Sequence, residues 1–285
     1  MLCHLKRFAV LLLLFYFQHL FSQVIETTAP LIIDESRSTI RTRFIPPKGF
    51  YWINEEPGSF SQFLNNFPLH PPNFPVRDFT GVPIEQQQHH IALLKIDVGV
   101  KNLQQCADAW IRLYAEYLWI NQRFDEIGFE FTSSQFFTWN DFKKGIRTKE
   151  LNKKVSFIKT EKEDNSYENF QKYLEVIFRY AGTISLDRES IPIKNNAAIK
   201  TGDFLIKPGS PGHSVIIVGV ARNLAGKKLY LLAESFMPAQ DIHVLVNHQN
   251  PQLSPWYELD VGAPETTTAK YIFKPTSIKR FHALR

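Results

Sequence analysis

The sequence predicts an α+β fold in which long helices precede an antiparallel meander of strands. Apolar residues recur every three or four positions in 103–124 and 167–180, as on one face of an amphipathic helix. Three short runs rich in β-branched residues follow within 203–233, separated by turn residues. A block of helices followed by a block of strands is typical of the α+β class.

The first 22 residues have the pattern of a secretory signal peptide. Lys6 and Arg7 precede an apolar run over 8–17, and a small residue, Ser22, stands where cleavage is expected. The run is too short to span a bilayer, and polar residues interrupt it, which argues against an uncleaved membrane anchor. We therefore expect an exported protein, periplasmic or extracellular, that has no stable membrane insertion after cleavage.

Composition limits the partners and cofactors of the mature chain. Without the two basic residues of the signal, the formal net charge falls from +5 to +3, and the remaining basic residues are scattered. This pattern predicts no nucleic-acid partner, and no zinc-ligand spacing is present, so we expect no metal or other cofactor. The sequence does not predict the oligomeric state.

The region 46–80 is rich in proline and aromatic residues. Proline fixes φ and removes a backbone donor, so we expect turns and extended pieces that wrap over the core. Ser59 and Gln62 have the spacing of a capping box and predict one short helix there. No Gly/Ser linker divides the chain, so we expect 23–285 to be a single domain with an N-terminal wrapping segment.

The middle and last parts of the chain supply the predicted core. We expect a strand at 91–98, then a helix from about 103 to 124 capped by Asn102, then a second helix at 167–180. The predicted meander consists of three strands joined by short turns, over 203–206, 214–220 and 228–233.

Cys106 is the one cysteine that remains after the signal, which contains Cys3, is removed. An exported chain with a single cysteine cannot form an intramolecular disulfide, so the thiol is either buried as a small apolar group or used. Cys106 falls in the first turn of the predicted helix, where free N–H groups and the helix dipole favour the thiolate. We therefore expect a lowered pKa and a nucleophilic thiol.

His213 is the candidate general base, and Glu234 is the candidate group that orients its ring. His213 follows a Pro-Gly turn and opens the second strand of the meander, and Glu234 ends the third. A solvated histidine and a surface salt bridge are the alternative interpretations. Gln105, Gln240 and Trp256 are the candidate substrate-binding residues, although a plain turn around Gln240 and core packing of Trp256 are the simpler alternatives.

These motifs resemble the NlpC-type branch of the papain-like cysteine hydrolases. The resemblance rests on three segments: Gln105-Cys106-Ala-Asp108 opening a helix, Thr201-Gly-Asp203-Phe, and Gly212-His213-Ser-Val-Ile. It implies a papain-like (NlpC-type) fold, in which a helix packs on an antiparallel sheet, and it implies cell-wall peptides as substrates.

The chain is also similar to the bacterial family known as domain of unknown function 4846. The similarity spans roughly 45–260 and includes Leu103-Gln-Gln-Cys-Ala-Asp108, Tyr180-Ala-Gly-Thr183, Met237-Pro-Ala-Gln240 and Ser254-Pro-Trp-Tyr257. This family name implies no activity.

Together these patterns predict an exported cysteine hydrolase that cleaves an amide or peptide bond through Cys106, His213 and Glu234. The first alternative is a catalytically silent envelope protein of the same fold that binds a peptide or glycan. The second is a purely structural envelope protein.

Overall fold

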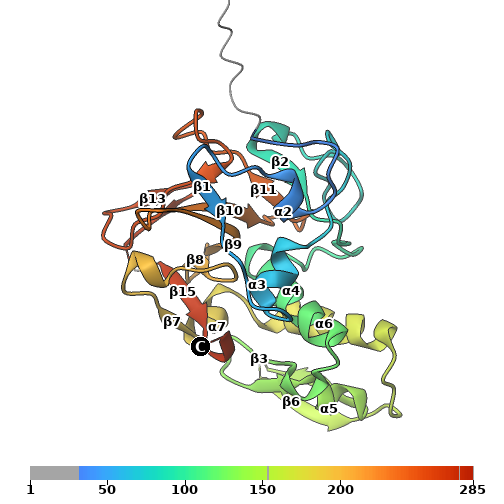
Figure 1. The fold of residues 1–285 in the computed structure, drawn as a ribbon. Coiled ribbons are helices and arrows are strands. Elements are labelled where there is room, and N and C mark those ends of the chain that lie inside the picture. The colour runs from blue at the N-terminus through green and yellow to red at the C-terminus, as the bar shows by residue number, and fades with distance from the viewer. Residues whose placement is uncertain (1–31, 153, 276, 285) are drawn as a thin grey trace, which may run out of the picture. The chain divides into compact units, whose positions relative to one another are not determined.

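A nine-stranded antiparallel sheet is the main element of the fold (Figure 1). The computed structural model describes residues 32–152, 154–275 and 277–284, and the expected signal peptide at 1–22 lies outside these ranges. Residues Ile32–Arg285 form one unit. Within the described ranges, no helix has the length and apolarity needed to cross a membrane.

The strands of the large sheet come from all parts of the described chain. Seven of them run in the order β2-β11-β10-β9-β8-β15-β7, while β1 pairs with one end of β9 and β12 pairs with β10. The nine strands are β1 (Phe50–Trp52), β2 (His90–Leu93), β7 (Ser190–Pro192), β8 (Phe204–Lys207), β9 (His213–Asn223), β10 (Lys228–Glu234), β11 (His243–Leu245), β12 (Trp256–Tyr257) and β15 (Ile278–Phe281).

Three two-stranded sheets accompany the large one. The β5–β6 hairpin is mostly exposed along its length, whereas β14 packs against the core through Phe273. The three pairs are β3 (Gly128–Glu130) with β4 (Phe136–Thr138), β5 (Ile146–Leu151) with β6 (Lys154–Lys159), and β13 (Thr266–Thr267) with β14 (Ile272–Phe273).

Among the helices of the described residues, two are long and the others are short. The long ones are α4 (Cys106–Ile120), which is buried along most of its length, and α6 (Tyr167–Tyr180), which buries one face. The short ones are α2 (Ile40–Arg43), α3 (Phe60–Asn65), α5 (Trp139–Lys143) and α7 (Thr183–Arg188), with 3₁₀ turns at Gln87–His89, Phe124–Glu126, Asn196–Ala198 and His282–Leu284.

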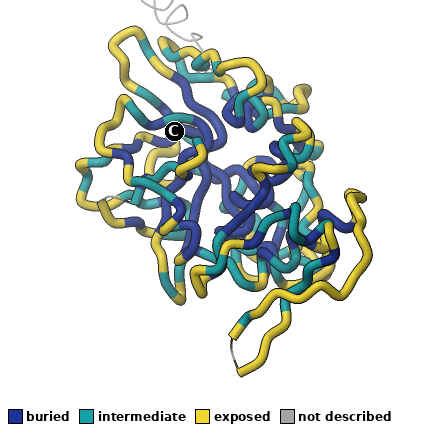
Figure 2. Tube along the Cα trace, turned by 90° about the horizontal axis from the view of Figure 1, so that it is seen from below, coloured by how far each residue is buried: buried dark blue, intermediate teal, exposed yellow. Residues whose placement is uncertain are grey.

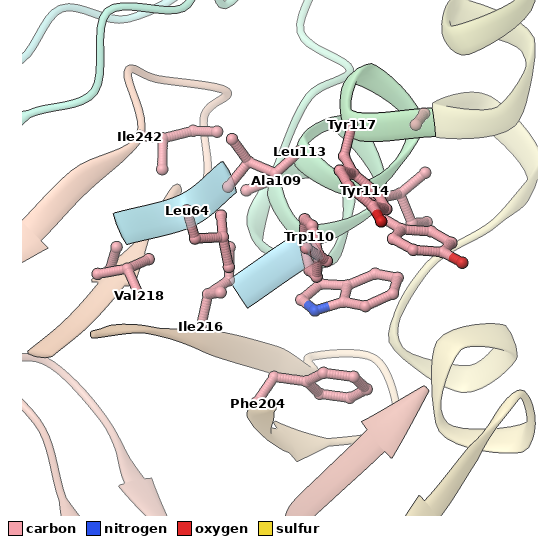
Figure 3. Packing of buried hydrophobic residues seen from close by; sticks show 14 of the residues in the cluster. Leu64, Ala109, Trp110, Leu113, Tyr114, Tyr117, Phe204, Ile216, Val218 and Ile242 are labelled. Atoms are coloured by element: carbon pink, nitrogen blue, oxygen red, sulfur yellow. The ribbon is translucent and has the colours of Figure 1, made fainter. Parts of the chain in front are cut away.

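The two faces of the central strands bury different cores. Ile216 and Val218 of β9 belong to the larger core, beside Leu64 of α3 and the apolar face of α4 (Figure 3). Val215 and Ile217 alternate with them and belong to a second core on the opposite face. Figure 2 shows the buried residues gathered in the middle of the trace, with exposed residues toward its outside. Because both faces are buried, β9 is a nearly continuous apolar run.

The prediction of a papain-like helix packed on an antiparallel sheet was wrong. Most of the regular structure lies in the nine-stranded sheet and the three small sheets, and helices are few. The error has a physical cause. Strands such as β11, β12 and β15 contain only two to four residues, so they are too short to show an alternating pattern in the sequence.

Several local predictions were confirmed and others need correction. The short helix after Ser59 is α3, where the Ser59 hydroxyl accepts a hydrogen bond from the Gln62 backbone N–H at 3.1 Å. The second long helix and the three-strand meander β8–β9–β10 are also confirmed. However, the strand expected at 91–98 is only His90–Leu93, and the helix expected at 103–124 is only Cys106–Ile120.

Candidate functional site

Cys106 is the first residue of α4, and its backbone N–H therefore has no helical carbonyl partner. Gln105 is the N-cap residue, and its N–H donates to Asp108 Oδ2 at 3.0 Å. Asn102 was the predicted cap, but its side-chain oxygen instead accepts from the Ala239 N–H at 2.8 Å. A tertiary contact has replaced the local one.

The Cys106 thiol is free, 7% exposed, and held in its protonated form. Burial raises its pKa to about 11, and the nearby Asp108 carboxylate adds to the shift. The backbone N–H groups of Ala107 and Ser214 lie near the sulfur and act in the opposite direction, but their effect is smaller. The expected lowering of the thiol pKa was therefore wrong, because desolvation outweighs the favourable helix terminus.

His213 and Glu234 form a buried pair. His213 Nε2–H donates to Glu234 Oε2 at 2.8 Å, and the two side chains are 3% and 0% exposed. Burial alone would raise the pKa of the Glu234 carboxyl, but the interactions with His213 and His243 lower it to about 2. The imidazole also packs against the rings of Phe236 and Tyr271, with ring centroids 5.0 Å and 4.7 Å away. The carboxylate is therefore ionised at neutral pH and fixes one ring nitrogen.

The thiol and the imidazole both lie at the start of β9. His213 is the first residue of this strand, and the backbone N–H of Ser214, the second residue, lies near the Cys106 sulfur. The His213 ring packs beside Tyr271 and Phe273, on the side of the second core. Among the described residues, no hydrogen bond joins Cys106 to His213, and Nδ1 of His213 makes no hydrogen bond. The two groups therefore lie at the same end of β9 without being bonded.

A second imidazole and a lysine complete the surroundings of Glu234. His243 pairs with Glu234 in the β10–β11 register, and its Nε2 lies 3.7 Å from Glu234 Oε1. Its Nδ1–H donates to the Asp241 carbonyl at 2.8 Å. Lys270 Nζ lies 3.9 Å from the same carboxylate oxygen. Sequence reasoning missed both groups, although a histidine inside a short apolar run was a usable signal for His243.

The three predicted substrate-binding residues have different surroundings. Gln105 is partly exposed, and its side chain donates to Asn102 at 3.1 Å. Gln240 is 3% exposed, and its side-chain Nε2 is buried without a partner in the described structure. Trp256 is fully buried in the larger core and donates to the Ile45 carbonyl at 3.1 Å. The placement of Trp256 is that of a core residue, because no face of its ring is open to a ligand.

Several buried polar atoms near the thiol have no hydrogen-bond partner in the described part of the chain. They are Ser214 Oγ, Asp108 Oδ1 and Gln104 Nε2. Gln104 was also missed by sequence reasoning; its side-chain oxygen accepts from Arg112 at 3.1 Å, which leaves the amide nitrogen free. Unpaired buried polar groups are costly, so a cluster of them suggests a place where another molecule completes the hydrogen bonds. No group of three or more potential metal ligands occurs in the ranges that the structure describes.

Comparison with known families gives one match. The family model described as domain of unknown function 4846 matches residues 40–280, which include Cys106, His213 and Glu234. The chain belongs to this family. No curated protein and no solved structure matches this family member. The comparisons give no support to the resemblance with NlpC-type hydrolases, so the function of this 4846-family chain must be inferred from its own site.

Proposed function

We propose that this member of the 4846 family is an exported cysteine hydrolase that cleaves an amide or peptide bond, with cell-wall peptides as the candidate substrates. The proposal rests on the buried His213–Glu234 pair at the start of β9. The next residue of that strand is Ser214, and its backbone N–H lies near the Cys106 sulfur. The sequence motifs that resemble NlpC-type hydrolases are the support for the substrate class, and the signal-like pattern at 1–22 is the support for export.

A buried ionised carboxylate is a functional indication because burying it is costly. Glu234 is 0% exposed and ionised. Removing a charge from water is often not repaid by its interactions, so hydrophobic residues of similar volume would frequently be as stable or more stable. Strongly shifted groups of this kind are concentrated at catalytic sites. The lowered pKa of Glu234 and the raised pKa of Cys106 are therefore two shifted groups within one neighbourhood.

In the proposed reaction the thiol is protonated at rest. Nδ1 of His213 removes the proton as Sγ of Cys106 attacks the carbonyl carbon, and Glu234 stabilises the resulting imidazolium through Nε2–H. The C–N bond then breaks, and the imidazolium gives its proton to the leaving amine. Water attacks the thioester, which releases the acid and restores the thiol. The Cys106 N–H, free at the helix start, is the candidate oxyanion donor.

This reaction requires the imidazole and the thiol to approach each other when substrate binds. Catalytic hydrogen bonds are often long or misaligned without substrate and tighten in the complex. The unpaired Ser214 hydroxyl and Gln104 amide beside the thiol are groups that a peptide backbone can satisfy on binding. In this proposal, the free energy gained when the substrate completes these hydrogen bonds brings the imidazole and the thiol together.

The experiment that tests the proposal uses peptide libraries and soluble cell-wall fragments as substrates. The wild-type protein is compared with Cys106→Ser, His213→Ala and Glu234→Gln, and products are identified by mass spectrometry. A matched control is Lys101→Ala, which removes an exposed residue of a surface ion pair. We expect cleavage by the wild type and the control, and loss of cleavage in Cys106→Ser and His213→Ala. Cleavage that persists without the thiol contradicts the proposal.

One observation favours a second candidate function. The thiol is buried, its pKa is raised, and it is not bonded to His213, which suits a catalytically silent protein that binds a peptide or glycan. In that case Cys106→Ser retains binding of the same fragments, and no substrate is consumed by the wild type at any pH between 5 and 9. Equilibrium binding measured beside turnover separates the two functions.

A further inference from the structure

A cavity of about 850 Å³ lies on the side of the second core, away from the thiol. Its walls come from β10, β12 and β13 and from the loops around Asn196 and Asn250, and they do not include Cys106, His213 or Glu234. The volume is within the usual range for small-molecule sites, which is roughly 300–1,000 Å³.

Tyr230 supplies the most informative polar group of this cavity. The residue is only 1% exposed, and its ring belongs to the second core. Among the described residues its hydroxyl has no hydrogen-bond partner, yet the oxygen is not among the atoms sealed from solvent. Tyr257, also in the lining, instead donates to the Val246 carbonyl at 2.5 Å. A buried tyrosine hydroxyl usually finds a partner, so the uncommitted hydroxyl of this lining residue is a candidate ligand contact.

The other polar side chains of the lining are mainly hydroxyls and amides. Thr266 and Thr267 of β13 contribute hydroxyls, and Gln249 and Asn250 contribute amides. Within the described ranges, none of these four side chains makes a hydrogen bond. The loop is held by the backbone N–H groups of residues 249 and 250, which donate to Asn247 Oδ1. Hydroxyl and amide groups can each donate and accept, so they match a ligand whose groups do the same.

Four of the five charged side chains of the lining are already occupied, and Glu265 is the one without a partner among the described residues. Lys227 pairs with Glu258, and Lys228 donates to the carbonyls of Ala197 and Ile199 at 2.6 Å and 2.7 Å. Asp260 accepts from the Asn196 side chain at 2.9 Å. Both lysines of the described lining are therefore committed, which disfavours a phosphate, sulfate or other polyanion.

We propose that this cavity binds a short neutral glycan. Sugar hydroxyls donate and accept hydrogen bonds, as the free threonine, amide and tyrosine groups of the lining can. A neutral sugar also needs no cationic partner, and the two lysines of the lining are already bonded to other groups. Tyr230 is the most buried residue of this set, and in the proposed complex its hydroxyl donates to or accepts from one sugar hydroxyl. This site is separate from the thiol and does not depend on hydrolysis.

The test is ligand-observed NMR followed by calorimetry with four neutral trisaccharides: chitotriose in its N-acetylated form, cellotriose, maltotriose and mannotriose. We expect saturable binding of at least one. Tyr230→Phe keeps the ring in the core and should weaken that binding about 3- to 10-fold, the effect of one lost neutral hydrogen bond. Thr266→Val should weaken it by a similar factor.

The matched control is Tyr51→Phe, which removes the hydroxyl of an exposed tyrosine outside the cavity and should leave the affinity unchanged. The proposal is overturned if none of the four sugars binds, or if Tyr230→Phe and Tyr51→Phe bind equally well. Binding is measured without turnover, so its failure is distinguishable from a failure of the proposed hydrolase.

Discussion

Nε2 of His213 lies 2.8 Å from Oε2 of Glu234, and both side chains are almost completely shielded from water. His243 and Lys270 approach the other carboxylate oxygen at 3.7 Å and 3.9 Å. One buried carboxylate thus faces three groups that can be cationic. Substitutions of Glu234 can separate what its carboxylate contributes to the stability of the fold from what it contributes to the proposed reaction.

Removing the Glu234 carboxylate should destabilise the protein strongly. Glu234→Ala leaves the buried His213 N–H without its acceptor, which costs about 1–3 kcal/mol, and the cavity left by the missing side chain adds to this cost. Glu234→Gln keeps an acceptor oxygen for the imidazole N–H and should cost clearly less. Urea denaturation measures both free energies of unfolding. Equal losses for the two variants would mean that the hydrogen bond to His213 contributes little.

The same carboxylate predicts a specific acid sensitivity. Its pKa is lowered from an ordinary 4.5 to about 2 in the folded protein, so the unfolded chain binds the proton first as pH falls. The stabilisation is therefore complete above pH 4.5 and is lost as pH falls toward 2. The difference in unfolding free energy between wild type and Glu234→Gln should shrink over this window, as measured by denaturation at several pH values. A difference that stays constant would contradict the assigned pKa.

Cys106 should react slowly with iodoacetamide at neutral pH. A pKa of about 11 in place of an ordinary 9.0 leaves roughly 100-fold less thiolate at pH 7 than in an exposed cysteine. Burial raises the pKa of Asp108 to about 8, so its carboxylate opposes ionisation of the thiol only above that pH. Asp108→Asn should therefore speed the alkylation above about pH 8 and shift that part of its pH profile to lower pH.

The control for the alkylation experiment is Asp125→Asn, an exposed aspartate that hydrogen-bonds Asn140 at 2.7 Å. It should leave the pH profile unchanged. Fast alkylation of the folded wild-type protein below pH 7 would show that the thiol is not held protonated as described.

Asp203 should be important for stability and not for the thiol. Its carboxylate is fully buried and accepts two hydrogen bonds from Arg280, at 2.7 Å and 2.9 Å, which tie β8 to β15. Asp203→Ala leaves the guanidinium unpaired and should cost about 3–5 kcal/mol. The alkylation profile of Cys106, measured where this variant is folded, should match that of the wild type. A shifted profile would instead connect the Gly-Asp motif to the reactive site.

Local signals in the sequence predicted what local physics decides. The apolar stripe of α6 and the cap at Ser59 depend on neighbouring residues, and both are present in the structure. The contact between His213 and Glu234 was also expected, because consecutive strands of a meander lie side by side. These features depend mainly on residues that are close in the sequence or in consecutive strands.

Features that depend on distant residues could not be predicted. Asn102 has the residue type of an N-cap, yet it binds the Ala239 N–H, which only the fold brings near. The position of Cys106 at a helix start was correctly placed, but the burial that raises its pKa comes from tertiary packing. Lys270 approaches Glu234 from a segment with no motif at all. Electrostatic surroundings of a site are therefore the part that sequence patterns specify least.

The most direct test of the central claim is acyl transfer from a dipeptide p-nitrophenyl ester at pH 7, followed by the mass of the intact protein. The peptide amides of this ester can complete the hydrogen bonds of Ser214 and Gln104, as the approach of the imidazole to the thiol requires. We predict that Cys106 becomes acylated in the wild type, that the acylated form is absent in Cys106→Ser, and that its formation is much slower in His213→Ala. Acylation of Cys106 at the same rate without the imidazole, or no acylation of the folded wild-type protein, would contradict a thiol activated by His213.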